Sequence, residues 1–218
     1  MGVKQKICSF IYYKVLGWKT KVIVPDHPKY IICCGPHTSN WDLFIGKLFY
    51  AAIGRKTQFM MKKEWFFWPL GPMFRAIGGI PVNRGRRNSL VDQMVDACNR
   101  SETFHLAITP EGTRKATPNW KKGFYHIAMN AGVPIVVIGI DYEKKLIVCE
   151  KELMPTGDLE KDLREIKLYM KDFKGKIPQI RQGALCLEAQ TEPNCINHGE
   201  GIYEKAKYTN NSRFMNSL

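Results

Sequence analysis

The chain has 218 residues, of which 44% are hydrophobic, so it can bury one good-sized core but not two large ones. Its formal net charge is +13, and such a basic balance favours an anionic partner: a nucleic acid, a membrane surface or a phosphorylated substrate. The seven cysteines form no Cys-x-x-Cys pair and show no Cys/His spacing for four zinc ligands. We interpret them as reduced thiols of a cytoplasmic protein, which argues against a zinc site and a secreted disulfide scaffold.

Residues 1–29 combine aromatic, apolar and basic side chains. The apolar run 7–13 is surrounded by lysines at positions 4, 6, 14, 19 and 21. This pattern favours a helix on an anionic membrane surface, although a core helix with a solvated edge has the same pattern. Lys14 interrupts the run and no small-residue cleavage site follows, which argues against a signal peptide. No apolar stretch approaches the roughly 20 residues of a spanning helix, so we expect peripheral contact with the cytoplasmic face of a membrane.

From residue 30 onward, short β-rich runs alternate with helix-like stretches. Strands are predicted over 30–34, 57–61, 80–82, 105–109, 134–140 and 146–149, and helices over 42–53, 89–99, 122–131 and 159–173. The alternation predicts one α/β layered domain, residues 30–181, with a mixed, partly parallel sheet flanked by helices. Residues 182–218 lack sustained periodicity and hold three Lys or Arg and four Glu. We expect a loosely attached or disordered tail there.

The segment 35–42, with the sequence GPHTSNWD, is the most informative part of the chain. It follows an apolar strand and opens a helix, and Thr38, Ser39 and Asn40 are suitable helix N-caps. His37 then lies just before the helix and Asp42 in its first turn, so the two side chains can meet. A carboxylate that bonds one imidazole nitrogen leaves the other able to accept a proton. A lone His-x4-Asp is common by chance, and a helix-start acid beside a surface histidine is the alternative.

Other strand ends carry further polar groups. Arg84 follows the glycine-led strand 80–82 and is suited to bind a phosphate, whereas Arg86 and Arg87 fit a solvated charge run. The strand 105–109 leads into Pro-Glu-Gly-Thr-Arg, residues 110–114, which fits an anion-binding loop or an ordinary β-turn. Residues 62–70, KKEWFFWPL, place aromatic residues beside lysines. This second segment suits a membrane interface or a core helix with a solvated edge.

Taken in order, four blocks resemble the lysophospholipid and glycerolipid acyltransferase family, whose best-known members are the 1-acylglycerol-3-phosphate acyltransferases. They are His-x4-Asp, a glycine-led strand ending in Arg, Pro-Glu-Gly-Thr-Arg and a Val-Pro-Ile strand that begins at Val133, and together they cover residues 30–141. The resemblance implies that His37 is the general base and Asp42 its orienter. It also implies an acceptor-binding set, which comprises Lys62 or its neighbour Lys63, Arg84, Glu111, Gly112, Thr113 and Arg114.

The resemblance implies acyl transfer from an acyl thioester, carried by coenzyme A or acyl carrier protein, to the hydroxyl of a lysophospholipid, above all 1-acylglycerol-3-phosphate. Another lysolipid or an acylated amino-acid lipid stays an alternative acceptor, and a non-catalytic lipid-binding module on the same fold is the alternative to an enzyme. No Ser or Cys occupies a nucleophile elbow, which favours direct transfer, with helix-start amides as candidate oxyanion donors. No metal or dissociable cofactor is implied. Specific nucleic-acid binding is disfavoured, because no binding motif is present.

Overall fold

The structure is a computed structural model that describes residues 2–83, 90–114 and 117–177. Within these residues, a five-stranded main sheet has the order β1-β7-β6-β2-β5. Its strands are β1 (Lys19–Val22), β2 (Lys29–Gly35), β5 (Phe104–Ile108), β6 (Ile135–Asp141) and β7 (Leu146–Leu153). β2 runs parallel to both of its neighbours and β1 runs parallel to β7, while β6 and β7 are antiparallel. The predicted mixed, partly parallel sheet is therefore confirmed.

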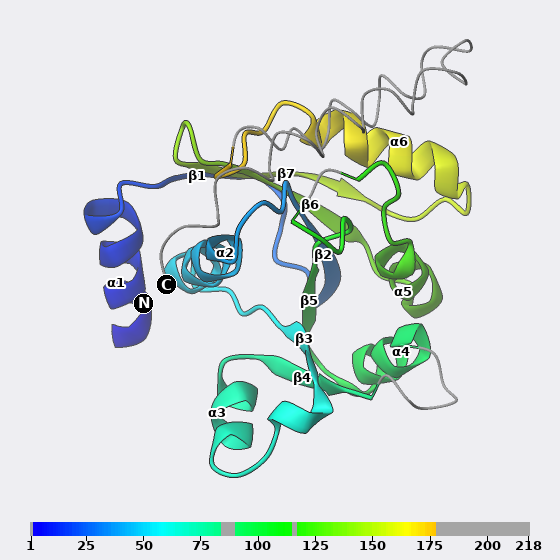
Figure 1. Ribbon diagram of the computed structural model, residues 1–218, viewed down its shortest axis with the longest axis horizontal. Helices are drawn as coiled ribbons and strands as arrows, with labels where there is room; N and C mark the ends of the chain where they lie inside the picture. The colour runs from blue at the N-terminus through cyan, green and yellow to red at the C-terminus, as the bar shows by residue number, and fades with distance from the viewer. Residues whose placement is uncertain (1, 84–89, 115–116, 178–218) are drawn as a thin grey trace, which may run out of the picture.

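Helices cover both faces of this sheet (Figure 1). The first face is covered by the π-helical η1 (Phe10–Val15) and α2 (Trp41–Ala52), with α1 (Val3–Ser9) packed against α2. The second face is covered by α4 (Leu90–Arg100), α5 (Gly123–Ala131) and α6 (Leu159–Met170). Side chains of β2 alternate between the two cores. Tyr30 and Ile32 pack toward α2, whereas Ile31 and Cys33 pack toward α5. Burial on both faces explains the nearly continuous apolar runs of the central strands.

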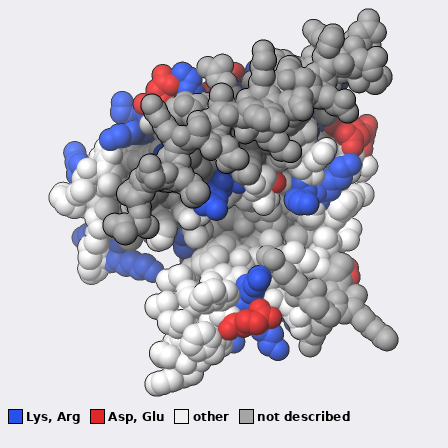
Figure 2. Space-filling view, viewed as in Figure 1, with Lys and Arg blue, Asp and Glu red and all other residues white. Residues whose placement is uncertain are grey.

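A smaller lobe, residues 59–82, projects from the edge of the sheet at β5 and is called the aromatic lobe below (Figure 1). Its parallel strands pair with each other, and an isolated bridge between Gln58 and Leu106 links its base to β5. In Figure 2 the lobe occupies the lower left and its surface is mostly uncharged. Its elements are β3 (Phe59–Lys62), η2 (Lys63–Trp65), α3 (Leu70–Ala76) and β4 (Gly79–Val82).

The predicted elements all form, and the structure adds some that the sequence pattern does not mark. α3 contains Gly71 and Pro72, which read as helix breakers, but a proline in the first helical turn costs no hydrogen bond. β7 continues through the charged residues 150–152, because their side chains are partly or fully exposed while Lys151 and Glu152 pair with β6. β1, within the expected membrane-surface lead-in, joins the main sheet as an edge strand.

No helix in the described part of the chain is both long and apolar enough to cross a membrane. The predicted helix of residues 1–29 corresponds to α1 and η1. The predicted tail 182–218 and the arginines Arg84, Arg86 and Arg87 lie outside the described residues.

Candidate active site

The candidate site lies where the parallel strands β2, β5 and β6 end. Cys33 of β2 is in register with Ile108 of β5, and Gly35 of β2 with Gly139 of β6, so the carboxyl ends reach one edge of the sheet. The segments that follow these strands carry His37, Glu111 and Tyr142 respectively. This edge is the usual ligand-binding position of open α/β sheets.

His37 and Asp42 form a hydrogen-bonded pair within the His37 loop, residues 35–42. The Nδ1 atom of His37 lies 3.0 Å from Oδ2 of Asp42. The same oxygen accepts hydrogen bonds from the backbone N–H groups of Thr38 and Ser39, both at 2.9 Å. These amides belong to the loop before α2, so the carboxylate fixes the backbone of this loop as well as holding the histidine. The meeting of the two side chains that the spacing predicts is present.

Tyr142, at the end of β6, completes the environment of Asp42. Its hydroxyl donates to Oδ1 of Asp42 at 2.7 Å. Burial by itself raises the pKa of Asp42, but hydrogen bonds from His37, Ser39, Tyr142 and Thr38 outweigh it and lower that pKa below its ordinary value. Asp42 is therefore an ionised carboxylate, with both oxygens held by donors.

Glu111 lies beneath the His37 loop and is only 2% exposed. Its Oε1 accepts the backbone N–H of His37 at 3.3 Å, while its Oε2 is buried and has no hydrogen-bond partner among the described residues. Burial raises the pKa of Glu111 to about 7. This geometry lets Glu111 hold the backbone of His37, and the acceptor-binding role that the resemblance implies for Glu111 stays a prediction.

The rest of the Pro-Glu-Gly-Thr-Arg loop faces the start of α2. Gly112 has a φ of +62°, a conformation that glycine adopts without strain, and its N–H donates to the carbonyl of Thr109 at 3.1 Å. The guanidinium of Arg114 is exposed, and its Nη1 donates to Oδ1 of Asn40 at 3.3 Å. Thr113 is half-buried between Gly112 and Arg114. The loop thus brings an exposed cation next to the His37 loop.

The remaining predicted binding residues are Lys62 and Arg84. Lys62 is exposed at the end of β3, in a depression that it shares with Glu64, Trp65 and Phe67. Arg84 lies outside the described residues. Their roles stay predictions.

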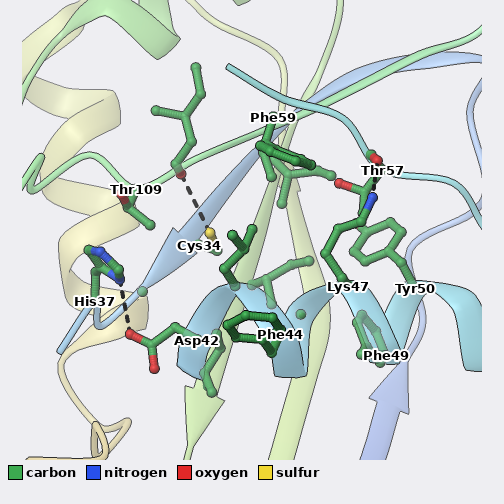
Figure 3. A pocket seen from close by; sticks show the side chains of 18 of the residues that line it. Cys34, His37, Asp42, Phe44, Lys47, Phe49, Tyr50, Thr57, Phe59 and Thr109 are labelled. Carbon is green, nitrogen blue, oxygen red and sulfur yellow. Dashed lines mark hydrogen bonds and ion pairs between the residues drawn. The ribbon is translucent and has the colours of Figure 1, made fainter. Parts of the chain in front are cut away.

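A cavity of about 650 Å³ extends from the His37–Asp42 pair between α2 and the strands. Figure 3 shows His37, Asp42 and Thr109 at one end, and Lys47, Tyr50, Thr57 and Phe59 at the other. Its lining is mainly apolar and includes Ile32, Cys34, Leu43, Phe44, Phe49, Ala107 and Ile138. The volume and the apolar character are typical of a site for a small molecule or an acyl chain.

Comparison with known proteins identifies the family of this chain. The sequence profile of the family described as Acyltransferase matches residues 20–141, which is more than half of the chain. The chain belongs to the acyltransferase family. The resemblance predicted from the four motifs is thereby confirmed.

Individual relatives agree with this assignment. The acyltransferase is 25% identical over 185 residues to a 1-acyl-sn-glycerol-3-phosphate acyltransferase of Haemophilus influenzae, covering 75% of this chain and 76% of the relative. It is 30% identical over 129 residues to a protein of the same name from Limnanthes douglasii, covering 56% of this chain and 45% of the relative. The crystal structure of the 1-acyl-sn-glycerophosphate acyltransferase PlsC from Thermotoga maritima has the same fold. The TM-score is 0.52 at 18% identity, over 85% of this chain and 80% of that chain.

The acyltransferase has a candidate positioning residue that its motifs do not mark. Tyr142 lies 100 positions from Asp42 in the sequence. The available signal is its place just after the predicted strand 134–140 of a partly parallel sheet, since parallel strands end at one edge. The sequence does not reveal which side chain at that edge points toward Asp42.

Three backbone amides in the His37 loop of the acyltransferase, just before α2, are engaged in hydrogen bonds. Those of Thr38 and Ser39 donate to Asp42, and that of His37 donates to Glu111. These hydrogen bonds hold the loop. The expectation that amides at the start of the following helix stabilise a transition-state oxyanion stays a prediction.

Proposed function

We propose that this acyltransferase moves an acyl group from a thioester to the free hydroxyl of a lysophospholipid, with 1-acylglycerol-3-phosphate as the principal acceptor. The observation that carries the proposal is the His37–Asp42 pair at one end of a largely apolar cavity. The names of the sequence relatives support the choice of acceptor.

His37 acts as the general base in this mechanism. Because Nδ1 donates to Asp42, Nε2 carries the lone pair that accepts the proton of the acceptor hydroxyl. The hydroxyl oxygen attacks the thioester carbonyl carbon, the C–S bond breaks, and the imidazolium returns the proton to the departing thiolate. The products are the acylated lipid and a free thiol. Asp42 stabilises the imidazolium in between.

The transfer is direct in this proposal, without an acyl-enzyme. Cys34 is the thiol in the cavity lining, and burial raises its pKa to about 12. Its Sγ donates to the carbonyl of Ile108 at 3.6 Å. A thiol with that pKa is protonated at neutral pH and is a poor nucleophile. A radiolabelled acyl group that stays covalently bound to the protein would contradict this step.

The cavity holds an acyl chain in the same proposal. Gly46 of α2 lines it, and a Cβ at that position meets no atom of the described residues within 4 Å. The Cβ of a Gly46→Leu side chain therefore meets no clash, and the substitution adds bulk to the cavity lining. We expect the variant to prefer shorter acyl chains, measured as relative kcat/KM across a series of chain lengths. An unchanged preference would place the chain elsewhere.

Arg114 is the proposed phosphate contact of the acceptor, because it is exposed beside the His37 loop. Five residues stay in the proposed acceptor-binding set on the resemblance alone: Lys62, Arg84, Glu111, Gly112 and Thr113. A coenzyme A thioester and an acyl carrier protein are both acidic, so the net charge of +13 suits either donor.

The test is acyl transfer from labelled acyl-CoA or acyl carrier protein to a panel of lysolipids and an acylated amino-acid lipid. The wild type is compared with His37→Ala and with His126→Ala, a matched control on the exposed side of α5. Loss of a general base lowers kcat by roughly 10²–10⁴-fold. We expect that loss for His37→Ala alone, with lysophosphatidate as the best acceptor. Equal rates in both variants would refute the mechanism, and no product with either donor would refute the function.

A further inference from the structure

The aromatic lobe exposes large apolar side chains of a kind that soluble proteins normally bury in their core. Trp68 is 84% exposed, Phe67 55% and Trp65 52%, and Met73 and Ile77 are nearly half exposed. The buried residue of η2 and α3 is Gly71. Contiguous exposed apolar side chains of this size mark an interaction surface.

The exposure results from a defined packing arrangement within the lobe. Phe66 and Phe74 pack with their ring centroids 6.0 Å apart, and the guanidinium of Arg75 lies over the ring of Phe66 at 5.5 Å. A Cβ at position 71 meets the carbonyl oxygen of Phe66 at 2.7 Å, so only glycine permits this close approach. These contacts direct Phe66 and Phe74 inward. They leave exposed Trp65, Phe67 and Trp68, which are called the lobe tip below.

The charges around the exposed aromatics are mostly positive. Lys62, Lys63 and Arg75 are exposed beside a single acidic residue of the lobe, Glu64. Tryptophan with nearby lysine is the combination found at the boundary between lipid headgroups and acyl chains. Anionic headgroups complement the lysines.

We propose that the aromatic lobe inserts into the surface of an anionic lipid bilayer. The proposal rests on the proposed function, because a lysophospholipid acceptor resides in such a surface. It identifies the lobe tip, above all Trp68, as the inserted element.

The position of the lobe gives this contact a role in substrate entry. β3 belongs to the lobe, and its residues Phe59 and Met60 line the cavity that reaches His37. On the opposite side of the cavity, Leu43 and Phe44 of α2 also line it and are 45% and 63% exposed. A bilayer against the lobe therefore lies next to apolar side chains that continue into the cavity.

α1 and η1 provide a second contact with the same chemistry. Val3, Ile7 and Phe10 are exposed at helical spacing, and Lys4, Lys6 and Lys14 are exposed near them. In Figure 1, α1 and α3 both lie away from α5 and α6. The lobe remains the primary contact, because its aromatics are the larger anchors.

The test is flotation of the full chain with vesicles of phosphatidylcholine, alone or mixed with phosphatidylglycerol. W68S/M73S is compared with the control M154S/L168S, whose residues are 55% and 40% exposed away from the lobe. Burial energies of these side chains predict at least about a tenfold loss of vesicle binding for the lobe variant and little change for the control. Equal binding of the two variants would overturn the proposal.

Further measurements separate the docking from the chemistry. Lys63→Gln is expected to weaken binding to the anionic vesicles about fivefold and to leave neutral vesicles unaffected. W68S/M73S should lose activity on vesicle-borne acceptor while it retains activity on a short-chain acceptor in solution. His37→Ala should bind vesicles as the wild type does. If the wild type binds vesicles but transfers no acyl group, the proposed function is refuted and the docking proposal stands. Self-association through the lobe in place of vesicle binding would overturn the docking.

Discussion

The His37 loop and the aromatic lobe depart from the usual distribution of side chains in opposite directions. In the loop, the carboxylate of Asp42 is buried, although charged groups normally remain in water. In the lobe, Trp68 is exposed, although large aromatic residues normally enter a core. Each departure costs free energy in the isolated protein, and each is retained at a position with a proposed role in acyl transfer.

The two regions differ in what compensates that cost. Asp42 is compensated internally, by donors from its own loop and from Tyr142. Among the described residues, the exposed aromatics of the lobe have no such compensation, and their proposed partner is a bilayer. Substitutions in the loop should therefore damage chemistry or folding, and substitutions at the lobe tip should damage only the contact with lipid.

The largest expected effect belongs to Asp42→Asn. The amide keeps one oxygen, which can accept from His37, Thr38 and Ser39 only if its N–H₂ group faces the hydroxyl of Tyr142. The amide also favours the wrong histidine tautomer. We expect kcat to fall about a thousandfold, with a loss of roughly 1–3 kcal/mol in the free energy of unfolding. Steady-state kinetics and denaturant titration measure the two effects. A fall in stability without a fall in kcat would assign Asp42 a structural role only.

A smaller effect concerns the pH dependence of stability through Glu111. Its pKa is raised by burial from 4.5 to about 7 in the folded protein. The stability that the protonated group contributes is complete below pH 4.5 and is lost as pH rises to about 7, on the order of 3 kcal/mol in all. Glu111→Gln should remove this decline, as followed by urea titrations between these pH values. The exposed Glu160→Gln serves as control. An unchanged pH profile in Glu111→Gln would contradict the assignment.

Tyr142→Phe should have a moderate effect on catalysis. Loss of one hydrogen bond to an ionised carboxylate is worth roughly 1.5 kcal/mol, so we expect kcat to fall about tenfold at unchanged KM. The pKa of Asp42 should rise toward its ordinary value, which moves the acid limb of the kcat profile to higher pH. Tyr13→Phe removes a hydrogen bond of 3.1 Å to Thr20 and is the matched control. The same pH profile in both variants would reduce Tyr142 to a packing residue.

The smallest expected effect is on the stability of the lobe variant W68S/M73S. Because both side chains are largely solvated in the absence of lipid, their removal should change the free energy of unfolding by no more than about 0.5 kcal/mol. Thermal and denaturant unfolding without vesicles measure this change. A loss of several kcal/mol would show that the tip packs against the protein, and the comparison with the His37 loop would fail.

The sequence determined the α/β class, the alternation of strands and helices, and the pairing of His37 with Asp42. These follow from features that are local in the chain: side-chain periodicity, helix-start residues, and the spacing of five positions between His37 and Asp42. The family assignment likewise followed from ordered motifs, and the profile over residues 20–141 confirms it.

Tertiary structure decided the features that depend on residues far apart in the sequence. The contact of Tyr142 with Asp42, the burial of Glu111 beneath the His37 loop, and the cavity between α2 and the strands all arise from strand register. The sequence also left undecided whether the tip of the aromatic lobe is exposed, because lysines beside aromatics occur both at membrane surfaces and at the edges of buried helices. Local pattern shows which residues are apolar, but only the packing of the whole chain determines which of them a core can accommodate.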